Sequence, residues 1–130
     1  MSLTLKNEKA KNKSIIADKA YHFALRIITV YKDLKKENEF VLSKQILRSG
    51  TSIGANVNEA ISAVSKKDFV YKLSISLKEA RETKYWLNLL KDSNYINEDL
   101  FNKSNEECEE LIKILSSIIL TTKERYLSNA

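Results

Sequence analysis

Apolar residues recur every three or four positions along most of the chain, a spacing that predicts amphipathic α-helices rather than strands. Residues 14–36 carry one such stripe, made of Ile16, Ala20, Phe23, Ile27, Val30 and Leu34. A second stripe beside it contains Tyr21, Leu25, Ile28 and Tyr31. Because an apolar side of a helix needs a partner to cover it, we expect this helix to have two neighbours.

Three further helices are predicted over residues 38–64, 65–91 and 97–127. Their connections are short, and short connections make consecutive helices antiparallel neighbours. The predicted fold is therefore all-α, an up-down-up-down antiparallel four-helix bundle. It forms one domain over residues 14–128, preceded by a basic, flexible N-terminal arm over residues 1–13.

The predicted helix ends carry residues that are typical of caps. Asn38 is expected to cap the start of the second helix. Ser65 and Asp68 form a capping box of the S-x-x-D kind at the start of the third helix, and Asn94 is a natural left-handed stop at its end. Asn97 is expected to cap the fourth helix.

Both glycines of the chain, Gly50 and Gly54, lie within the second predicted helix. The apolar stripe keeps its phase across them, which favours a continuous helix. Their spacing of four puts them on one side, where another backbone can approach closely, from a neighbouring helix or from another subunit. The alternative is a local bend at residues 49–52.

Composition narrows both the fold and the chemistry. The 130 residues include no Pro and two Gly, which argues against a many-stranded sandwich or barrel. One His and one Cys cannot form a Cys/His zinc site, and His22 lacks the Glu-x-x-His context of di-iron bundles. Cys108 is expected to be a small buried residue. We therefore expect no catalytic residues, no metal and no cofactor, and we expect that the protein is not an enzyme.

A single cysteine cannot form an intrachain disulfide, which favours a cytoplasmic protein. No apolar segment follows the basic N-terminus as in a signal peptide, and apolar runs such as residues 118–120 are far too short to cross a membrane. We expect no membrane partner and no small-molecule substrate.

The formal net charge is +5, from 22 Lys and Arg against 17 Asp and Glu, and the excess lies in the first fifty residues. Such an excess favours an anionic partner, RNA or DNA, although a basic arm is also typical of a solvated chain end. The candidate phosphate-binding residues are Lys6, Lys9, Lys11, Lys13, Lys66 and Lys67. On the fourth helix, residues 106–110 carry four glutamates, which predict a solvated face or a surface for a basic partner.

A polar stripe runs along the second helix beside its apolar stripe and contains Gln45, Arg48, Ser52, Asn56 and Glu59. At 100° per residue these side chains share a strip about 80° wide. Glu79 and Glu82 of the third helix are expected to pair with Arg48, Arg81 or Lys84. The stripe predicts a polar network at a seam between subunits or a site for a polar ligand, with an ordinary solvated face as the alternative.

The stretch from Gln45 to Ala60, QILRSGTSIGANVNEA, resembles the signature of the bacterial four-helix bundle proteins known as 23S rRNA intervening-sequence proteins. Residues 65–69 and 78–87, which include Trp86, match one branch of that family closely. Many members have Pro where this chain has Gly54, and Gly where it has Ala60. Gly54 is expected to loosen the helix rather than kink it.

The resemblance implies a left-handed up-down bundle that assembles into a homopentamer. The family is also similar to the accessory variability proteins of diversity-generating retroelements, which are basic pentamers that bind nucleic acid and a reverse transcriptase. It brings no catalytic residues. It implies that Arg48, Ser52, Asn56, Glu59, Glu79, Glu82 and Trp86 are structural or interface residues. Two functions stay open: a nucleic-acid-binding oligomer, or a structural or protein-interaction module without nucleic-acid binding.

Overall fold

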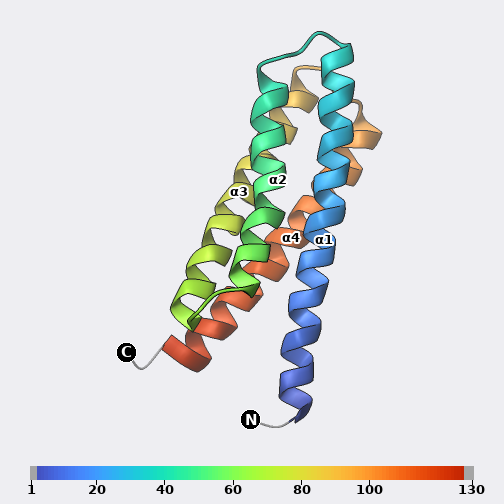
Figure 1. The fold of residues 1–130 in the computed structure, drawn as a ribbon. Helices are drawn as coiled ribbons and strands as arrows, with labels where there is room; N and C mark the ends of the chain where they lie inside the picture. Colours follow the sequence, from blue (N-terminus) through green and yellow to red (C-terminus); the bar gives the residue numbers. More distant parts are fainter. Residues whose placement is uncertain (1–2, 128–130) are drawn as a thin grey trace.

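The computed structural model describes the backbone of residues 3–127 and the side chains of residues 15–127. The described backbone is helical apart from short connections. Its elements are α1 (Leu3–Lys36), α2 (Leu42–Ile61), α3 (Lys66–Asp92), α4 (Glu98–Thr122) and a final π-helical turn, η1 (Lys123–Leu127). Figure 1 shows the four long helices running side by side.

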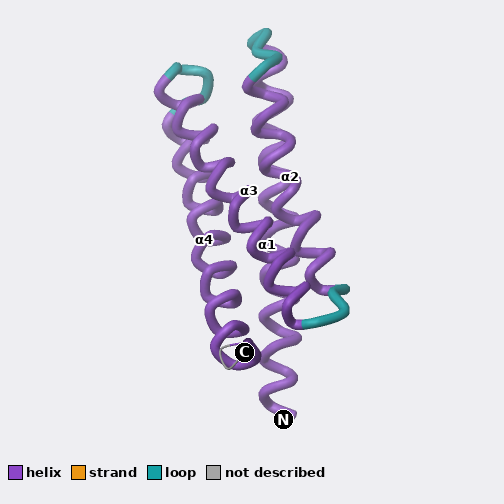
Figure 2. Tube along the Cα trace, turned by 90° about the vertical axis from the view of Figure 1, so that its left-hand side faces the viewer, coloured by secondary structure: helices purple, strands orange, loops and turns teal. Residues whose placement is uncertain are grey.

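Each helix runs antiparallel to the next one along the chain, and the connections lie at the two ends of the bundle (Figure 2). Helix α2 packs between α1 and α3, and α4 closes the bundle by packing on both α3 and α1. The predicted all-α, up-down-up-down four-helix bundle is confirmed.

The core lies along the bundle axis and is built from the predicted stripes. On α1 all six residues of the first stripe, from Ile16 to Leu34, are buried. The second stripe is covered less well, because Tyr21 and Leu25 remain 62% and 45% exposed. The fold therefore leaves one apolar side of α1 partly open to solvent.

The sequence predicted that Asn38 caps the start of α2, but this prediction is wrong. Asn38 instead ends α1. Its φ is +59°, in the left-handed region that Asn tolerates better than most residues. The backbone N–H of Asn38 donates to the carbonyl of Lys35 at 3.0 Å, and that of Glu39 donates to Leu34 at 2.9 Å. This pair of hydrogen bonds is the Schellman arrangement, which turns the chain out of α1 and toward α2.

The carboxylate of Glu39 takes the capping role at the start of α2. It accepts hydrogen bonds from the backbone N–H groups of Leu42 at 2.9 Å and Ser43 at 2.6 Å, and a longer one from Val41. Burial opposes the charge of Glu39, but these donors outweigh it and lower the pKa of its carboxyl below the ordinary value. The helix N-terminus thus binds an anion supplied by the preceding turn.

The other predicted caps are confirmed. The Ser65 side chain accepts from the N–H of Asp68 at 3.0 Å, and the Asn97 side chain accepts from Leu100 at 2.8 Å. Asn94 adopts a φ of +65° after α3.

Besides the start of α2, which lies at Leu42 rather than near residue 38, three boundaries differ from the sequence prediction. Helix α1 begins at Leu3 rather than near residue 14, and α2 ends at Ile61 rather than at residue 64. The residues after Ile61 form the turn that leads to the cap of α3. The last helix keeps α geometry only to Thr122 and ends in the π-helical turn.

Helix α2 is continuous through both glycines, which lie on its side facing α1. A Cβ atom built on Gly50 would lie 2.7 Å from Cγ2 of Ile27, whereas one on Gly54 would meet the Ala20 carbonyl oxygen at 3.5 Å. The glycines therefore serve a contact between two helices of the same chain, and only Gly50 is needed to relieve a steric clash.

Candidate functional site

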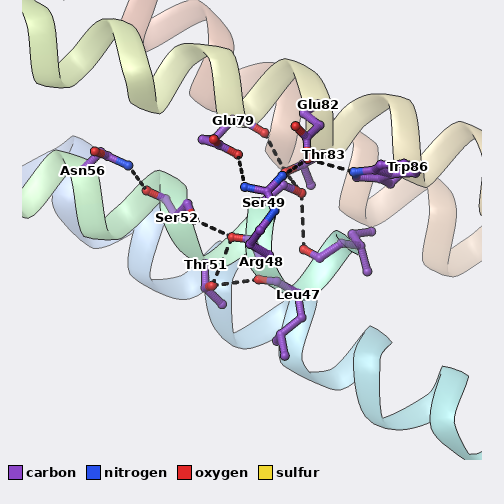
Figure 3. A network of polar contacts seen from close by, with 11 residues as sticks. Leu47, Arg48, Ser49, Thr51, Ser52, Asn56, Glu79, Glu82, Thr83 and Trp86 are labelled. Carbon is purple, nitrogen blue, oxygen red and sulfur yellow. Dashed lines mark hydrogen bonds and ion pairs between the residues drawn. The ribbon is translucent and has the colours of Figure 1, made fainter. Parts of the chain in front are cut away.

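The centre of the predicted polar stripe is an ion-pair cluster that joins α2 to α3 at the surface (Figure 3). Nη1 of Arg48 donates to Oε2 of Glu79 at 3.1 Å, and Nη2 of Arg48 donates to Glu82. The Glu79 side chain is only 13% exposed, while that of Arg48 is 49% exposed. The guanidinium therefore lies over a largely buried carboxylate and compensates for the loss of hydration there.

Trp86 completes this cluster. Its indole Nε1 donates to Oε2 of Glu82 at 3.0 Å, one helical turn away on α3 (Figure 3). Burial opposes the charge of Arg48, but the two carboxylates outweigh it and raise the pKa of the guanidinium above its ordinary value. We call Arg48, Glu79, Glu82 and Trp86 the α2–α3 cluster.

The remaining residues of the stripe do not join this cluster. Ser52 Oγ donates to the Arg48 carbonyl at 2.5 Å, and Asn56 Nδ2 donates to the Ser52 carbonyl at 2.8 Å. Both side chains therefore form hydrogen bonds with the backbone of their own helix. Glu59 pairs with Lys72 of α3 at 3.3 Å in a separate, exposed ion pair. Gln45 is exposed and has no polar partner among the described residues.

A second polar layer, which the stripe did not predict, lies inside the bundle beneath the cluster. The hydroxyls of Ser49 and Thr83 are buried and lie 2.8 Å apart, and Ser76 donates to the Ile53 carbonyl at 2.8 Å. The signal was present in the sequence. Ser49 occurs in phase with the apolar positions Ile46 and Ile53, so it had to face the core.

Cys108 lies on the α4 side of this core. It is fully buried, as predicted, and its Sγ donates to the Ala80 carbonyl at 3.2 Å. Burial raises the pKa of the thiol to about 12, with Lys84 acting weakly in the opposite direction. The group is therefore a neutral thiol, not a thiolate, near neutral pH.

The acidic face of α4 is largely neutralised by the chain itself. Glu110 pairs with Lys19 at 2.5 Å and Glu107 pairs with Arg26, both from α1. Glu109 pairs with Lys84 of α3 at 3.0 Å. These pairs tie α4 to both of its neighbours, so the basic surface that these glutamates face lies on α1 and α3 of the same chain.

The candidate phosphate-binding lysines are at two places. Lys66 and Lys67 are exposed at the start of α3, and Nζ of Lys66 lies 4.7 Å from the ring centroid of Tyr126. The side chains of Lys6, Lys9, Lys11 and Lys13 lie outside the described residues, and so does any contact they make. None of the helices described is long and apolar enough to span a membrane.

Comparison with known proteins identifies relatives of the chain. A sequence model of the family described as 23S rRNA-intervening sequence protein matches residues 12–117. A crystal structure of a protein of unknown function from the S23 ribosomal protein family of Bacteroides thetaiotaomicron is similar, with a TM-score of 0.81 and 50% identity. The match covers 83% of this chain and 97% of that one. No curated protein matches.

Proposed function

The chain belongs to the 23S rRNA-intervening sequence protein family, and we propose that it is a non-enzymatic, oligomeric protein of the cytoplasm that binds RNA or DNA through its basic surface. The observation that carries this proposal is the distribution of cations. Three of the four glutamates at residues 106–110 of α4, and both glutamates of the α2–α3 cluster, pair with the chain's own cations. The excess positive charge is therefore left on other surfaces.

Among the described residues, exposed cations without a carboxylate within 4 Å occur on all four helices, Lys44 of α2 and Lys113 of α4 among them, but α1 and α3 carry most of them. In the described part of the chain, no carboxylate lies within 4 Å of Lys32 or Lys36 of α1, or of Lys67, Lys78 or Arg81 of α3. All five side chains are exposed. Exposed cations without a protein counterion attract polyanions and release the ions condensed on them.

Binding of labelled RNA and DNA oligonucleotides, followed by fluorescence anisotropy at increasing salt, tests this proposal. We expect binding at low salt, with an affinity that falls linearly on a double logarithmic plot as salt rises. Absence of binding at low salt would contradict it. So would an affinity that does not respond to salt, because that would exclude phosphate contacts as the source of binding.

Self-association is the second part of the proposal, and the resemblance described above implies five copies. Its support is the open apolar side of α1, where Tyr21 and Leu25 are exposed although both belong to a helical apolar stripe. A stripe of this kind is typical of a helix that packs against a partner. A pentamer of the 14.9 kDa chain has a mass of about 75 kDa.

Light scattering on a size-exclusion column measures this mass. We expect Leu25→Lys to shift the protein toward the monomer, and Leu120→Lys, a matched change at an exposed leucine of α4, to leave the mass unchanged. A wild-type monomer near 15 kDa would overturn self-association. A stable oligomer that binds no nucleic acid would instead favour the second candidate function, a structural or protein-interaction module.

A further inference from the structure

Cations and tyrosines lie in one line on the exposed side of α3, and the line itself contains no acidic residue. The line, which we call the α3 strip, contains Lys67, Tyr71, Ser74, Lys78, Arg81 and Tyr85. These positions follow each other at steps of four and three, so they share one side of the helix about 80° wide. All six residues are exposed.

The two tyrosines of the strip do not contribute to the core. Tyr71 and Tyr85 are 61% and 58% exposed. Each ring is supported from one side. Nζ of Lys72 lies 6.0 Å from the Tyr71 ring centroid, and the Trp86 ring lies edge-on to Tyr85 at 5.2 Å. Most of each ring surface is left open to a ligand.

The three cations of the strip have no carboxylate partner among the described residues. The acidic residues closest to Lys78 and Arg81 along α3, Glu79 and Glu82, turn toward α2 and are both held by Arg48. Asp68 follows Lys67 directly but lies outside the line. The α2–α3 cluster thus keeps negative charge away from the strip. What remains is a positively charged helix face with two aromatic surfaces.

We propose that the α3 strip binds single-stranded RNA, with Tyr71 and Tyr85 stacking on bases and Lys67, Lys78 and Arg81 contacting phosphates. This inference rests on the proposed nucleic-acid binding and gives it a location and a ligand class. Fourteen residues separate the tyrosines, about 21 Å along the helix, and both cations between them can reach the backbone of a strand lying across the strip.

The chemistry of the strip favours a single strand over a duplex. Bases within a duplex are already stacked on one another, so exposed aromatic rings bind bases that are unstacked. The strip also presents hydroxyls at Tyr71, Ser74 and Tyr85. These can form hydrogen bonds with the ribose 2′-hydroxyl, which distinguishes RNA from DNA.

The test compares labelled single-stranded RNA, single-stranded DNA of the same sequence and duplex RNA at one low salt concentration. We expect single-stranded RNA to bind most tightly. We expect Tyr71→Ala/Tyr85→Ala to weaken its binding by about tenfold to hundredfold, whereas Tyr71→Phe/Tyr85→Phe retains most of the affinity because stacking survives. Lys78→Gln/Arg81→Gln should weaken binding of all three nucleic acids and reduce the salt dependence.

Phe40→Ala and Tyr95→Ala are matched controls, because they remove exposed aromatic residues of the α1–α2 and α3–α4 connections, which belong to neither proposed surface. Circular dichroism of each variant verifies that it folds. If the wild type binds RNA and Tyr71→Ala/Tyr85→Ala has no more effect than these controls, the assignment of RNA binding to the α3 strip is wrong. The proposed nucleic-acid binding itself is then not contradicted. Equal or tighter binding of DNA or duplex RNA overturns the ligand assignment, and absence of any binding overturns the proposed function as well.

Discussion

Gly50 of α2 faces Ile27 of α1 so closely that a Cβ atom on the glycine would lie 2.7 Å from Cγ2 and 2.8 Å from Cγ1 of the isoleucine. Both residues are fully buried or nearly so, and the isoleucine belongs to the core stripe of α1. The crossing of α1 and α2 therefore depends on the absence of a side chain at this position.

Gly50→Ala is expected to destabilise the protein. Alanine favours a helix by about 1 kcal/mol over glycine, but forcing a methyl group into Ile27 costs more, typically 1–3 kcal/mol for overpacking. We expect a net loss of about 1 kcal/mol in the free energy of unfolding, measured by urea denaturation. Gly54→Ala is the control, because its methyl group meets the Ala20 carbonyl at an ordinary 3.5 Å. It should gain up to about 1 kcal/mol, and equal gains at both positions would refute the close contact.

Removal of Arg48 is expected to cost more than removal of Glu59, although both belong to the same stripe of the sequence. Arg48→Ala leaves the largely buried Glu79 without a partner and should lower stability by about 1 kcal/mol, a fall of roughly 3–5 °C in the melting temperature. Glu59→Ala breaks only the exposed pair with Lys72, and such pairs contribute about 0–1 kcal/mol. Melting curves that rank the two variants in the opposite order would show that the α2–α3 cluster is not a structural element of the bundle.

The buried hydroxyls of Ser49 and Thr83 are expected to behave as a pair. Thr83→Val removes one partner, leaves the Ser49 hydroxyl with a single weak contact at 3.4 Å and should cost about 1–2 kcal/mol. Ser49→Ala/Thr83→Val removes both and should recover much of that loss, because no buried polar group is then stranded. Denaturant titrations of both single variants and of the double variant measure the coupling. Strictly additive losses would mean that the hydroxyls do not interact.

Glu39 is expected to make stability depend on acidic pH. Its pKa in the folded protein lies below the ordinary value of 4.5, despite burial, because backbone N–H groups of α2 stabilise the charged form. The stabilisation is therefore complete above the unfolded pKa and is lost as pH falls through the folded pKa. Glu39→Ala should lower the free energy of unfolding by about 1–2 kcal/mol at pH 7. The variant should also lose less stability than the wild type as pH falls.

The matched control for this change is Glu37→Ala, since Glu37 is exposed in the same turn and caps nothing among the described residues. Unfolding curves of the three proteins between pH 7 and pH 3 decide the matter. The idea fails if Glu39→Ala and the wild type lose stability in parallel as pH falls.

Local sequence patterns were sufficient for the architecture. Helical periodicity identified four helices, and side-chain caps such as Ser65 and Asn97 located two of their starts, because such a cap requires only a short polar side chain three residues before the N–H it satisfies. Asn38 shows where this reasoning fails. The same residue type caps a helix start or ends a helix in the left-handed region, and the backbone path after α1 selects the second role.

The polar residues of α2 also show which features helical spacing predicts and which depend on the tertiary structure. Helical spacing placed Arg48, Ser52 and Asn56 on one side of α2, but spacing within one helix says nothing about which side chain reaches across to the next. The tertiary structure directs Arg48 to Glu79 and Glu82 and leaves Ser52 and Asn56 on their own backbone.

The sequence by itself determined four amphipathic helices, an antiparallel order and a net positive charge, because these follow from periodicity, connection length and composition. Only the tertiary structure decided which charges remain uncompensated. Ion pairing depends on the distance between two charged groups in space, and the fold brings together residues as far apart in the chain as Arg26 and Glu107. By that geometry the acidic face of α4 is largely neutralised within the chain, and the three cations of the α3 strip are left facing solvent beside two exposed tyrosines.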